Sequence, residues 1–186
     1  MTYAPGREQG EIDIVTALAA DHRLVARLLD HLVGAPAAQR AERFGPLVTT
    51  LVAHEVAEEE ILYPAVRLVA PLAGDEVAAR LHEQAEATVL LQAMERHDPT
   101  GEAFAAALRA LQDAVPEHAA REEETIFPLL AEHHHALDRV TMGVRYEKAK
   151  AAAPTHPHPR LPQAPPGNLV LGPVAAVADR VRDALG

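Results

Sequence analysis

The chain has 186 residues, of which 48% are apolar and only 3% aromatic, and it carries a formal net charge of −10. The absence of cysteine excludes disulfide scaffolds, cysteine-ligated metal clusters and thiol nucleophiles, and the acidic balance disfavours nucleic acid and anionic membranes as partners. No apolar run reaches the ~20 residues of a membrane span and the N-terminus lacks a signal peptide, so we expect a cytoplasmic protein.

The spacing of apolar residues predicts four amphipathic helices, because these residues recur at steps of three and four. The expected ranges are 11–33, 37–70, 75–97 and 102–134, separated by short segments that contain Gly and Pro. Gly45 and Pro46 indicate a break in the second helix, and Pro64, Pro116 and Pro128 predict kinks. An alanine-rich, aromatic-poor composition suits closely packed helices. The sequence therefore predicts an all-α fold, an up-down-up-down four-helix bundle.

The C-terminal part has a different character. Residues 135–152 are expected either to extend the last helix or to form a short fifth one. Residues 154–173 hold seven of the 15 prolines and predict an extended strap, whereas residues 173–185 again show helical spacing. We interpret residues 11–150 as the bundle and 151–186 as a Pro-rich extension with a short terminal helix. That helix is expected to dock on the bundle, with a partner-binding tail as the alternative.

One eleven-residue pattern occurs twice in the sequence. It begins at His54 and again at His118, and both copies read His-x-x-x-Glu-Glu-Glu-x-aliphatic-aromatic-Pro. One further histidine, His22 or His82, lies on the predicted helix before each copy. The chain is therefore interpreted as a duplicated pair of helices.

The repeated histidines fall on the apolar faces of the predicted helices. Side chains four residues apart are neighbours on one face of a helix, so each helix is expected to turn its ionisable residues toward the core. These residues are His22 on the first helix, His54 and Glu58 on the second, His82 and Glu86 on the third, and His118 and Glu122 on the fourth.

Other ionisable residues near the motifs are expected to lie off this face. Glu55, directly after His54, can reach the core only from the edge of the face. Tyr63 lies nine residues after His54, half a turn away on an α-helix, and is interpreted as a packing residue unless Pro64 twists the chain. The remaining acidic residues of the two motifs are expected to face solvent; they are Glu59, Glu60, Glu123 and Glu124.

Carboxylates in a bundle core need compensation, because burying an unpaired charge costs several kcal/mol or more. A single His on an apolar stripe is more often a hydrogen-bonded core residue, and a single His-x-x-x-Glu is more often a solvated pair. The coincidence across four helices favours metal coordination in the core. Four imidazoles and three carboxylates are too many for one tetrahedral zinc. They suit two first-row ions with a bridging carboxylate, and a mixed nitrogen and oxygen set without sulfur favours non-haem iron or manganese.

The order His, His-x-x-x-Glu, His, His-x-x-x-Glu, with Leu-Tyr-Pro and Ile-Phe-Pro after the two motifs, resembles the hemerythrin-like (HHE cation-binding) domain family of bacterial type, over about residues 11–135. The resemblance implies a four-helix bundle that holds two iron ions joined by an oxo or hydroxo bridge and meets O2 or related small molecules. It also implies bridging roles for Glu58 and Glu122. The positions that match family ligands are His22, His54, Glu58, His82, His118 and Glu122.

Two departures from the oxygen carriers of this family bear on function. Glu86 stands where they have a second histidine on the third helix, and the last motif is His-x-x-x-Glu instead of His-x-x-x-x-Asp. A site so rich in carboxylates should stabilise ferric iron, so we expect reaction with O2, hydrogen peroxide or NO, with catalase-like peroxide removal as the enzymatic form. The alternative is an iron- or oxygen-sensing or iron-handling module without turnover. The sequence does not indicate an oligomeric state.

Overall fold

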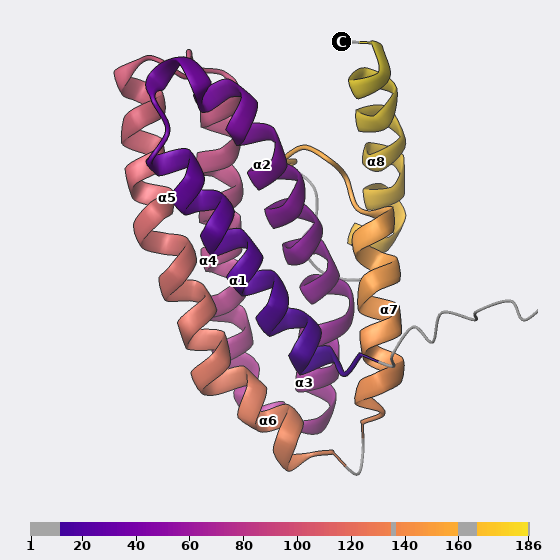
Figure 1. The fold of residues 1–186 in the computed structure, drawn as a ribbon. Coiled ribbons are helices and arrows are strands. Elements are labelled where there is room, and N and C mark those ends of the chain that lie inside the picture. Colours follow the sequence, from indigo (N-terminus) through magenta and orange to yellow (C-terminus); the bar gives the residue numbers. More distant parts are fainter. Residues whose placement is uncertain (1–11, 135–136, 160–166, 186) are drawn as a thin grey trace, which may run out of the picture.

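The computed structural model describes residues 12–134, 137–159 and 167–185, and these ranges contain helices and no strand. Four long helical stretches lie side by side (Figure 1). They are α1 (Ile14–Val33), α2 (Arg40–Ala57) continuing into α3 (Tyr63–Val69), α4 (Gly74–Glu95), and α5 (Glu102–Arg121) continuing into α6 (Phe127–Glu132). The all-α prediction is confirmed. None of the described helices is both long and apolar enough to cross a membrane.

Local polar contacts fix the ends of the helices. The side chain of Asp13 caps α1 by accepting a hydrogen bond from the Val15 amide at 2.9 Å, which satisfies a donor that the first turn leaves unpaired. Between α4 and α5, Asp98 Oδ1 accepts bonds from the amide and the hydroxyl of Thr100 at 2.9 and 2.8 Å. This turn ends the third helix where Asp and Pro predicted it.

Two π-helical segments interrupt the second and fourth stretches, and both begin at a motif glutamate. Segment η2 spans Glu58–Leu62 and segment η4 spans Glu122–Ile126. The Tyr63 amide bonds to the Glu58 carbonyl, and the Phe127 amide bonds to the Glu122 carbonyl, five residues back in each case. A π-turn takes in one more residue than an α-turn, so each aromatic residue lies nearly one turn beyond its glutamate, on the same face. Helices α3 and α6 follow these segments without a break and include Pro64 and Pro128, the positions at which we expected kinks.

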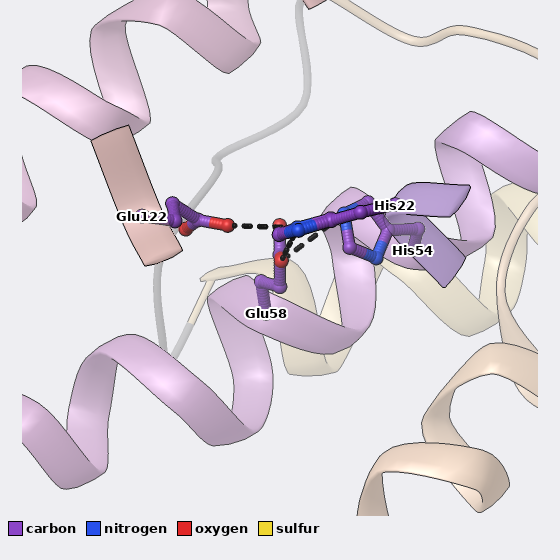
Figure 2. A group of neighbouring side chains, drawn as sticks. All are labelled: His22, His54, Glu58 and Glu122. Atoms are coloured by element: carbon purple, nitrogen blue, oxygen red, sulfur yellow. Dashed lines mark ion pairs between the residues drawn. The ribbon is translucent and has the colours of Figure 1, made fainter. Parts of the chain in front are cut away.

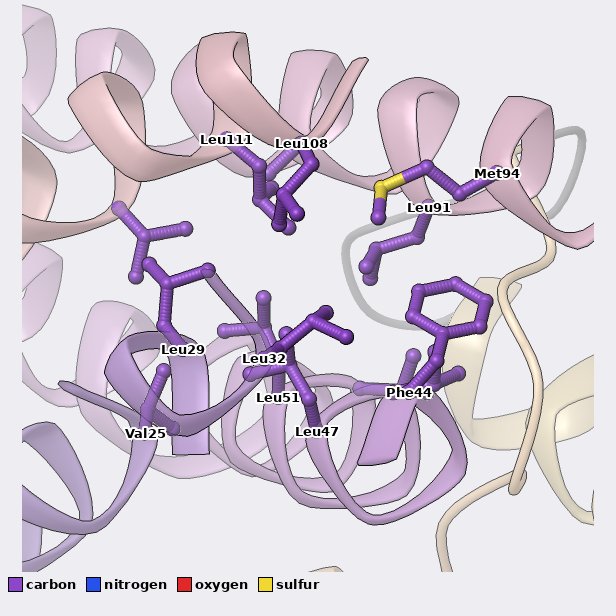
Figure 3. Close-up of a cluster of buried hydrophobic side chains, with 14 of the residues drawn as sticks. Val25, Leu29, Leu32, Phe44, Leu47, Leu51, Leu91, Met94, Leu108 and Leu111 are labelled. Carbon is purple, nitrogen blue, oxygen red and sulfur yellow. The ribbon is translucent and has the colours of Figure 1, made fainter. Parts of the chain in front are cut away.

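Two apolar clusters fill the bundle on either side of its middle. One, drawn in Figure 3, packs leucines and phenylalanines of α1, α2, α4 and α5, including Leu29, Leu47 and Leu111. The other gathers Leu18, Leu62 and further residues of α1, η2, α3, η4, α6 and α7. Most of these side chains are almost completely buried, so apolar groups flank the middle of the bundle on both sides.

Beyond the bundle, the chain forms two more helices. The short fifth helix, one of the two alternatives predicted, is α7 (Arg139–Ala152), and it packs against α1, α2 and η2. Asp138 caps it by accepting a bond from the Thr141 amide at 2.9 Å. In Figure 1, α7 runs alongside the bundle next to α2.

The last helix, α8, spans Gly167–Leu185 and is longer than predicted. The expectation that the strap extends to residue 173 is wrong, because the helix already includes Pro173. A proline inside a helix removes one backbone hydrogen bond, and here it does not end the helix. The division into domains at residue 150 remains a prediction.

His156 joins α8 to the bundle. Its Nδ1 bonds to Glu95 on α4 and its Nε2 lies 2.7 Å from Asp183 on α8. Burial alone would lower the pKa of His156, but the hydrogen bonds to Glu95 and Asp183 outweigh burial and raise it, against a small opposing effect of the Arg182 charge. A protonated His156 thus binds a carboxylate on each side.

We expect the attachment of α8 to weaken as pH rises. Because the pKa of His156 is higher in the folded protein than its ordinary value, the stabilisation is fully present below that ordinary value and is lost as pH rises through the raised pKa. Hydrogen exchange of α8 amides, corrected for intrinsic rates, should show less protection at high pH. His156→Gln should remove this pH dependence, while His97→Gln, at an exposed position after α4, should keep it. A pH dependence unchanged in His156→Gln would contradict the assignment.

Candidate metal centre

Four buried side chains meet in the middle of the bundle (Figure 2). They are His22 of α1, His54 of α2, Glu58 at the start of η2 and Glu122 at the start of η4, and one ligand atom of each lies within 4.8 Å of the other three. His54 Nε2 is 3.1 Å from Glu58 Oε1, and His22 Nε2 is 3.3 Å from Glu122 Oε2. From α5, His118 brings its Nε2 to 3.8 Å from Glu122 Oε2.

The atoms that face one another have no hydrogen-bond partner. Nε2 of His22, Nε2 of His118, Oε1 of Glu58 and Oε2 of Glu122 are all buried and unpaired. Buried polar atoms in proteins are nearly always paired, so four such atoms around one point need an explanation. Imidazole nitrogen and carboxylate oxygen are ligands of first-row metal ions. The residues present therefore fit a bound cation.

The other ring nitrogen of two of these histidines contacts a carboxylate. His22 Nδ1 is 2.8 Å from Glu123 Oε1, and His118 Nδ1 is 2.9 Å from Glu83 Oε2. An ionised carboxylate only accepts hydrogen bonds, so Nδ1 carries the proton in both rings. Nε2 is then the nitrogen left to coordinate a metal, an arrangement that is usual for metal-binding histidines.

His54 is held through a tyrosine of α7. The Tyr146 hydroxyl donates to Asp21 Oδ2 at 2.7 Å and lies 2.7 Å from His54 Nδ1, while Lys150 pairs with Asp21 at 2.6 Å. A tyrosine hydroxyl has one proton, and here Asp21 receives it. His54 Nδ1 must therefore donate its own proton to the hydroxyl oxygen, which leaves Nε2 free toward the cluster.

Each buried carboxylate also has one oxygen engaged and one left over. Gln84 Nε2 donates to Glu58 Oε2 at 2.7 Å, and the Tyr63 hydroxyl donates to Glu122 Oε1 at 2.6 Å. Gln84 Nε2 also donates to the Tyr63 hydroxyl at 2.9 Å, so Gln84 orients the hydroxyl that bonds to Glu122. The other oxygens, Glu58 Oε1 and Glu122 Oε2, face His54 and His22 and are the ones left to hold a cation.

Without a cation, protons balance the charges of the cluster. Burial alone would lower the pKa of His22, but the carboxylates of Glu122 and Glu58 raise it to about 11. Burial alone would raise the pKa of Glu122, but the neighbouring His22 and the charge of His118 lower it to about 2. Burial lowers the pKa of His54 well below its ordinary value. Burial, with the charge of Glu122, raises the pKa of Glu58 well above its own.

The structure does not bring His82 and Glu86 to this cluster. Their side chains are 74% and 67% exposed and contact each other at 3.4 Å, so the expectation that they face the core is wrong. Helix α4 turns another face inward, on which Arg80, Gln84 and Thr88 are buried. Gln84 occupies the inward-facing position on α4 at which we expected His82 and Glu86.

Glu55 lies beside the cluster and is not one of the four side chains whose ligand atoms converge. It is buried and accepts a hydrogen bond from Thr88 Oγ1 at 3.3 Å. Burial, followed by the charge of Glu59, raises the pKa of Glu55 well above its ordinary value. Glu55 is thus placed next to the centre, as its position in the motif predicted.

Several residues that support the cluster were not predicted from the sequence. Asp21, Gln84 and Tyr146 carry no motif and were missed. Two others were assigned to different roles: Tyr63 contacts Glu122 instead of only packing, and Glu123 contacts His22 instead of facing solvent alone. The expectation that Glu59 is solvated is also wrong, because it is buried. The aromatic residue lies five positions after the motif glutamate in both copies of the repeat, and this equal spacing was the one sequence signal that Tyr63 belongs to the centre.

Comparison with known proteins agrees with this geometry. The family model described as hemerythrin HHE cation binding domain matches residues 13–130. The chain belongs to this family. The matched part of this hemerythrin HHE domain contains His22, His54, Glu58, His118 and Glu122, and it ends before α7, the helix that supplies Tyr146.

Individual relatives are distant. An uncharacterised hemerythrin-like protein of Schizosaccharomyces pombe is 29% identical over 172 residues, which is 91% of this chain and 85% of the relative. A DNA nickase of Nostoc is 29% identical over 148 residues, and the match spans 78% of this chain but only 41% of that protein. The crystal structure of a hemerythrin HHE cation-binding domain-containing protein from Mycobacterium kansasii has the same fold, with a TM-score of 0.63 at 20% identity. It covers 75% of this chain, and the match takes in 88% of that chain.

Tyr146→Phe should weaken metal binding without unfolding the protein. It removes the acceptor that fixes the His54 ring and leaves Asp21 paired with Lys150. Loss of such a partner of a metal-binding histidine typically lowers metal affinity by about 10- to 100-fold, which competition with a chelator would measure. Met142→Leu, which alters the same buried face of α7 without touching a ligand, should leave the affinity unchanged. Equal affinities in the two variants would show that the hydroxyl does not act on the centre.

Proposed function

We propose that the cluster binds iron, two ions per chain, and that the protein reacts there with O2, hydrogen peroxide or NO. The observation that carries the proposal is the set of unpaired, buried nitrogen and oxygen atoms of His22, His118, Glu58 and Glu122, joined by His54 Nε2 at 3.1 Å from Glu58. Membership of a cation-binding family supports metal binding at this place.

The donor set supports iron. It consists of imidazole and carboxylate groups, and the chain has no cysteine that could add sulfur. Such mixed nitrogen and oxygen sites suit iron or manganese better than ions that prefer thiolates. Manganese in place of iron is an outcome that metal analysis would detect.

The internal duplication supports two ions. Each copy of the repeat supplies a histidine and a glutamate one turn apart: His54 with Glu58 at 3.1 Å, and His118 with Glu122 at 3.8 Å. His22 lies between the two pairs, 3.3 Å from Glu122 and 3.8 Å from Glu58. Two equivalent His–Glu pairs favour one ion at each pair.

The surroundings support reaction with small molecules. When bound, iron supplies the one-electron chemistry that reduces or decomposes O2 and peroxides. The chain's own groups hold the ligands in place: Gln84 and Tyr63 fix one oxygen of each carboxylate, and Tyr146 fixes the His54 ring. A cavity reaches His22, His54 and His118, which gives small molecules a route to the site.

Metal analysis tests the binding step. Protein produced in iron-replete cells and purified without a histidine tag should contain two iron atoms per chain. His54→Ala should lose most of this iron, because it removes the imidazole ligand next to Glu58. His82→Ala changes the same residue type at an exposed position and should keep full occupancy. One tightly bound zinc per chain with no uptake of iron would rule the proposal out.

Peroxide consumption tests the reaction. We expect the iron-loaded protein to convert two molecules of hydrogen peroxide into one O2 and two water molecules, measured with an oxygen electrode. Glu58→Ala should abolish this activity together with the iron, and Glu86→Ala, exposed on α4, should leave it unchanged. Reversible O2 binding without peroxide loss would indicate a carrier, and iron binding with no reaction would indicate a sensing or iron-handling module; either result overturns the peroxide assignment.

A further inference from the structure

Side chains that lose a single electron easily are few in this chain, and one of them touches the metal centre from α7. The chain has no tryptophan, no cysteine and three tyrosines. Tyr146 is 0% exposed, and its hydroxyl oxygen lies 2.7 Å from Nδ1 of His54. The centroids of the two rings are 6.4 Å apart. An electron can therefore pass through a direct contact from the phenol to the imidazole that faces the cluster.

The phenol also has a place to put its proton. A phenol gives up an electron readily only when its proton leaves with it, and the proton acceptor must lie within hydrogen-bond reach. The Tyr146 hydroxyl donates to Asp21 Oδ2 at 2.7 Å. The Lys150 ammonium lies 5.1 Å from the centroid of the Tyr146 ring and disfavours a positive charge on it. Loss of an electron from Tyr146 is therefore accompanied by transfer of its proton to Asp21.

The surroundings let the proton leave while they shield the ring. Asp21 pairs with Lys150 at 2.6 Å, and their side chains are 10% and 20% exposed, so the proton can pass from this pair to water. The Tyr146 ring itself is fully buried, on the same face of α7 as Met142 and Ala149. A dissolved reductant cannot touch it there. These are the conditions under which a tyrosyl radical persists.

The other buried tyrosine among the described residues lacks such a proton acceptor. The Tyr63 hydroxyl donates to Glu122 Oε1, and the second oxygen of Glu122 faces the cluster. A carboxylate that holds a cation is a poor proton acceptor, because the positive charge favours its ionised form. Asp21 is not one of the four side chains whose ligand atoms converge, so a metal at the centre leaves it available to accept a proton. The geometry therefore favours Tyr146 over Tyr63.

We propose that Tyr146 is a redox site of this protein, which gives one electron to the metal centre and becomes a neutral tyrosyl radical. The proposal rests on the proposed function, because hydrogen peroxide at the iron centre is the oxidant. One peroxide molecule takes up two electrons and two protons and becomes two water molecules. A ferrous ion supplies one electron as it becomes ferric, and Tyr146 supplies the other as its proton moves to Asp21; water supplies the two protons. Tyr146 thereby allows the centre to reduce peroxide when only one of its ions is ferrous.

Electron paramagnetic resonance tests this inference on the full iron-loaded chain, given one reducing equivalent per centre and frozen after mixing with hydrogen peroxide. We expect a radical signal that narrows when the protein is produced with ring-deuterated tyrosine. Because Tyr146→Phe also weakens metal binding, every variant is measured at saturating iron and the radical is counted per bound iron. The signal should be lost in Tyr146→Phe and kept in Tyr63→Phe. A signal kept in Tyr146→Phe, or no tyrosyl signal in protein that holds iron and consumes peroxide, would overturn the proposal.

Asp21→Asn tests the proton acceptor. It keeps an oxygen that can accept a hydrogen bond from Tyr146 but removes the base, so the radical yield per iron should fall about tenfold, the usual worth of a hydrogen bond to a charged group. Glu147→Gln removes the other carboxylate that pairs with Lys150, at 3.1 Å, and should leave the yield unchanged. Equal yields in the two variants would refute the role of Asp21.

Voltammetry of metal-free protein separates this result from a failure of the metal proposal. With Tyr3→Phe and Tyr63→Phe in the background, Tyr146 is the one tyrosine left in a chain without tryptophan or cysteine, so its oxidation is observed directly. Adding Asp21→Asn should shift the Tyr146 potential upward, whereas adding Glu147→Gln should not. An unchanged potential in Asp21→Asn would overturn the proposal whatever the iron content. The expected shift in a protein that binds no iron would count against the proposed function alone.

Discussion

Two fully buried carboxylates, Glu58 and Glu122, face imidazole nitrogens at the middle of the bundle, and the rest of the structure is organised around the cost of keeping charge there. Unpaired carboxylates in an apolar interior are strongly unfavourable. Apolar clusters lie on both sides of this region, so the neighbouring layers of the bundle offer few polar groups that could stabilise the charges. One oxygen of each carboxylate is held by a neutral donor, Gln84 or Tyr63, and the other is left for a cation.

The helices and the centre's main residues could be predicted because they leave simple periodic signals. Apolar residues at helical spacing gave the four long stretches, and the repeated His-x-x-x-Glu located His54, Glu58, His118 and Glu122. The π-segments could not be predicted in this way, since helical spacing assumes 3.6 residues per turn. The extra residue in η2 brings Tyr63 onto the face of Glu58, although its distance from His54 along the chain indicated the opposite side.

Helix α4 and the contacts of α7 lay beyond what the pattern could decide. Helix α4 itself consists largely of alanines and polar residues, so more than one of its faces could be its buried side. The sequence pattern therefore predicted the face with His82 as buried, whereas the structure buries the face with Gln84. Only packing against α5 and η4 distinguishes them. Tyr146 lies 92 positions from His54, the residue it contacts, and no local spacing encodes a contact between segments so far apart.

The contact between Tyr146 and His54 also links two equilibria, metal binding at the centre and docking of α7 on the bundle. If the docked α7 raises the affinity of the centre for a metal by some factor, thermodynamic reciprocity requires that bound metal strengthen the docking of α7 by the same factor. The helix that completes the centre lies outside the matched domain, and its opposite side presents Val144, 46% exposed, to the surroundings. Under that condition, metal occupancy in the core is coupled to the docking of a peripheral helix through one phenol and one imidazole.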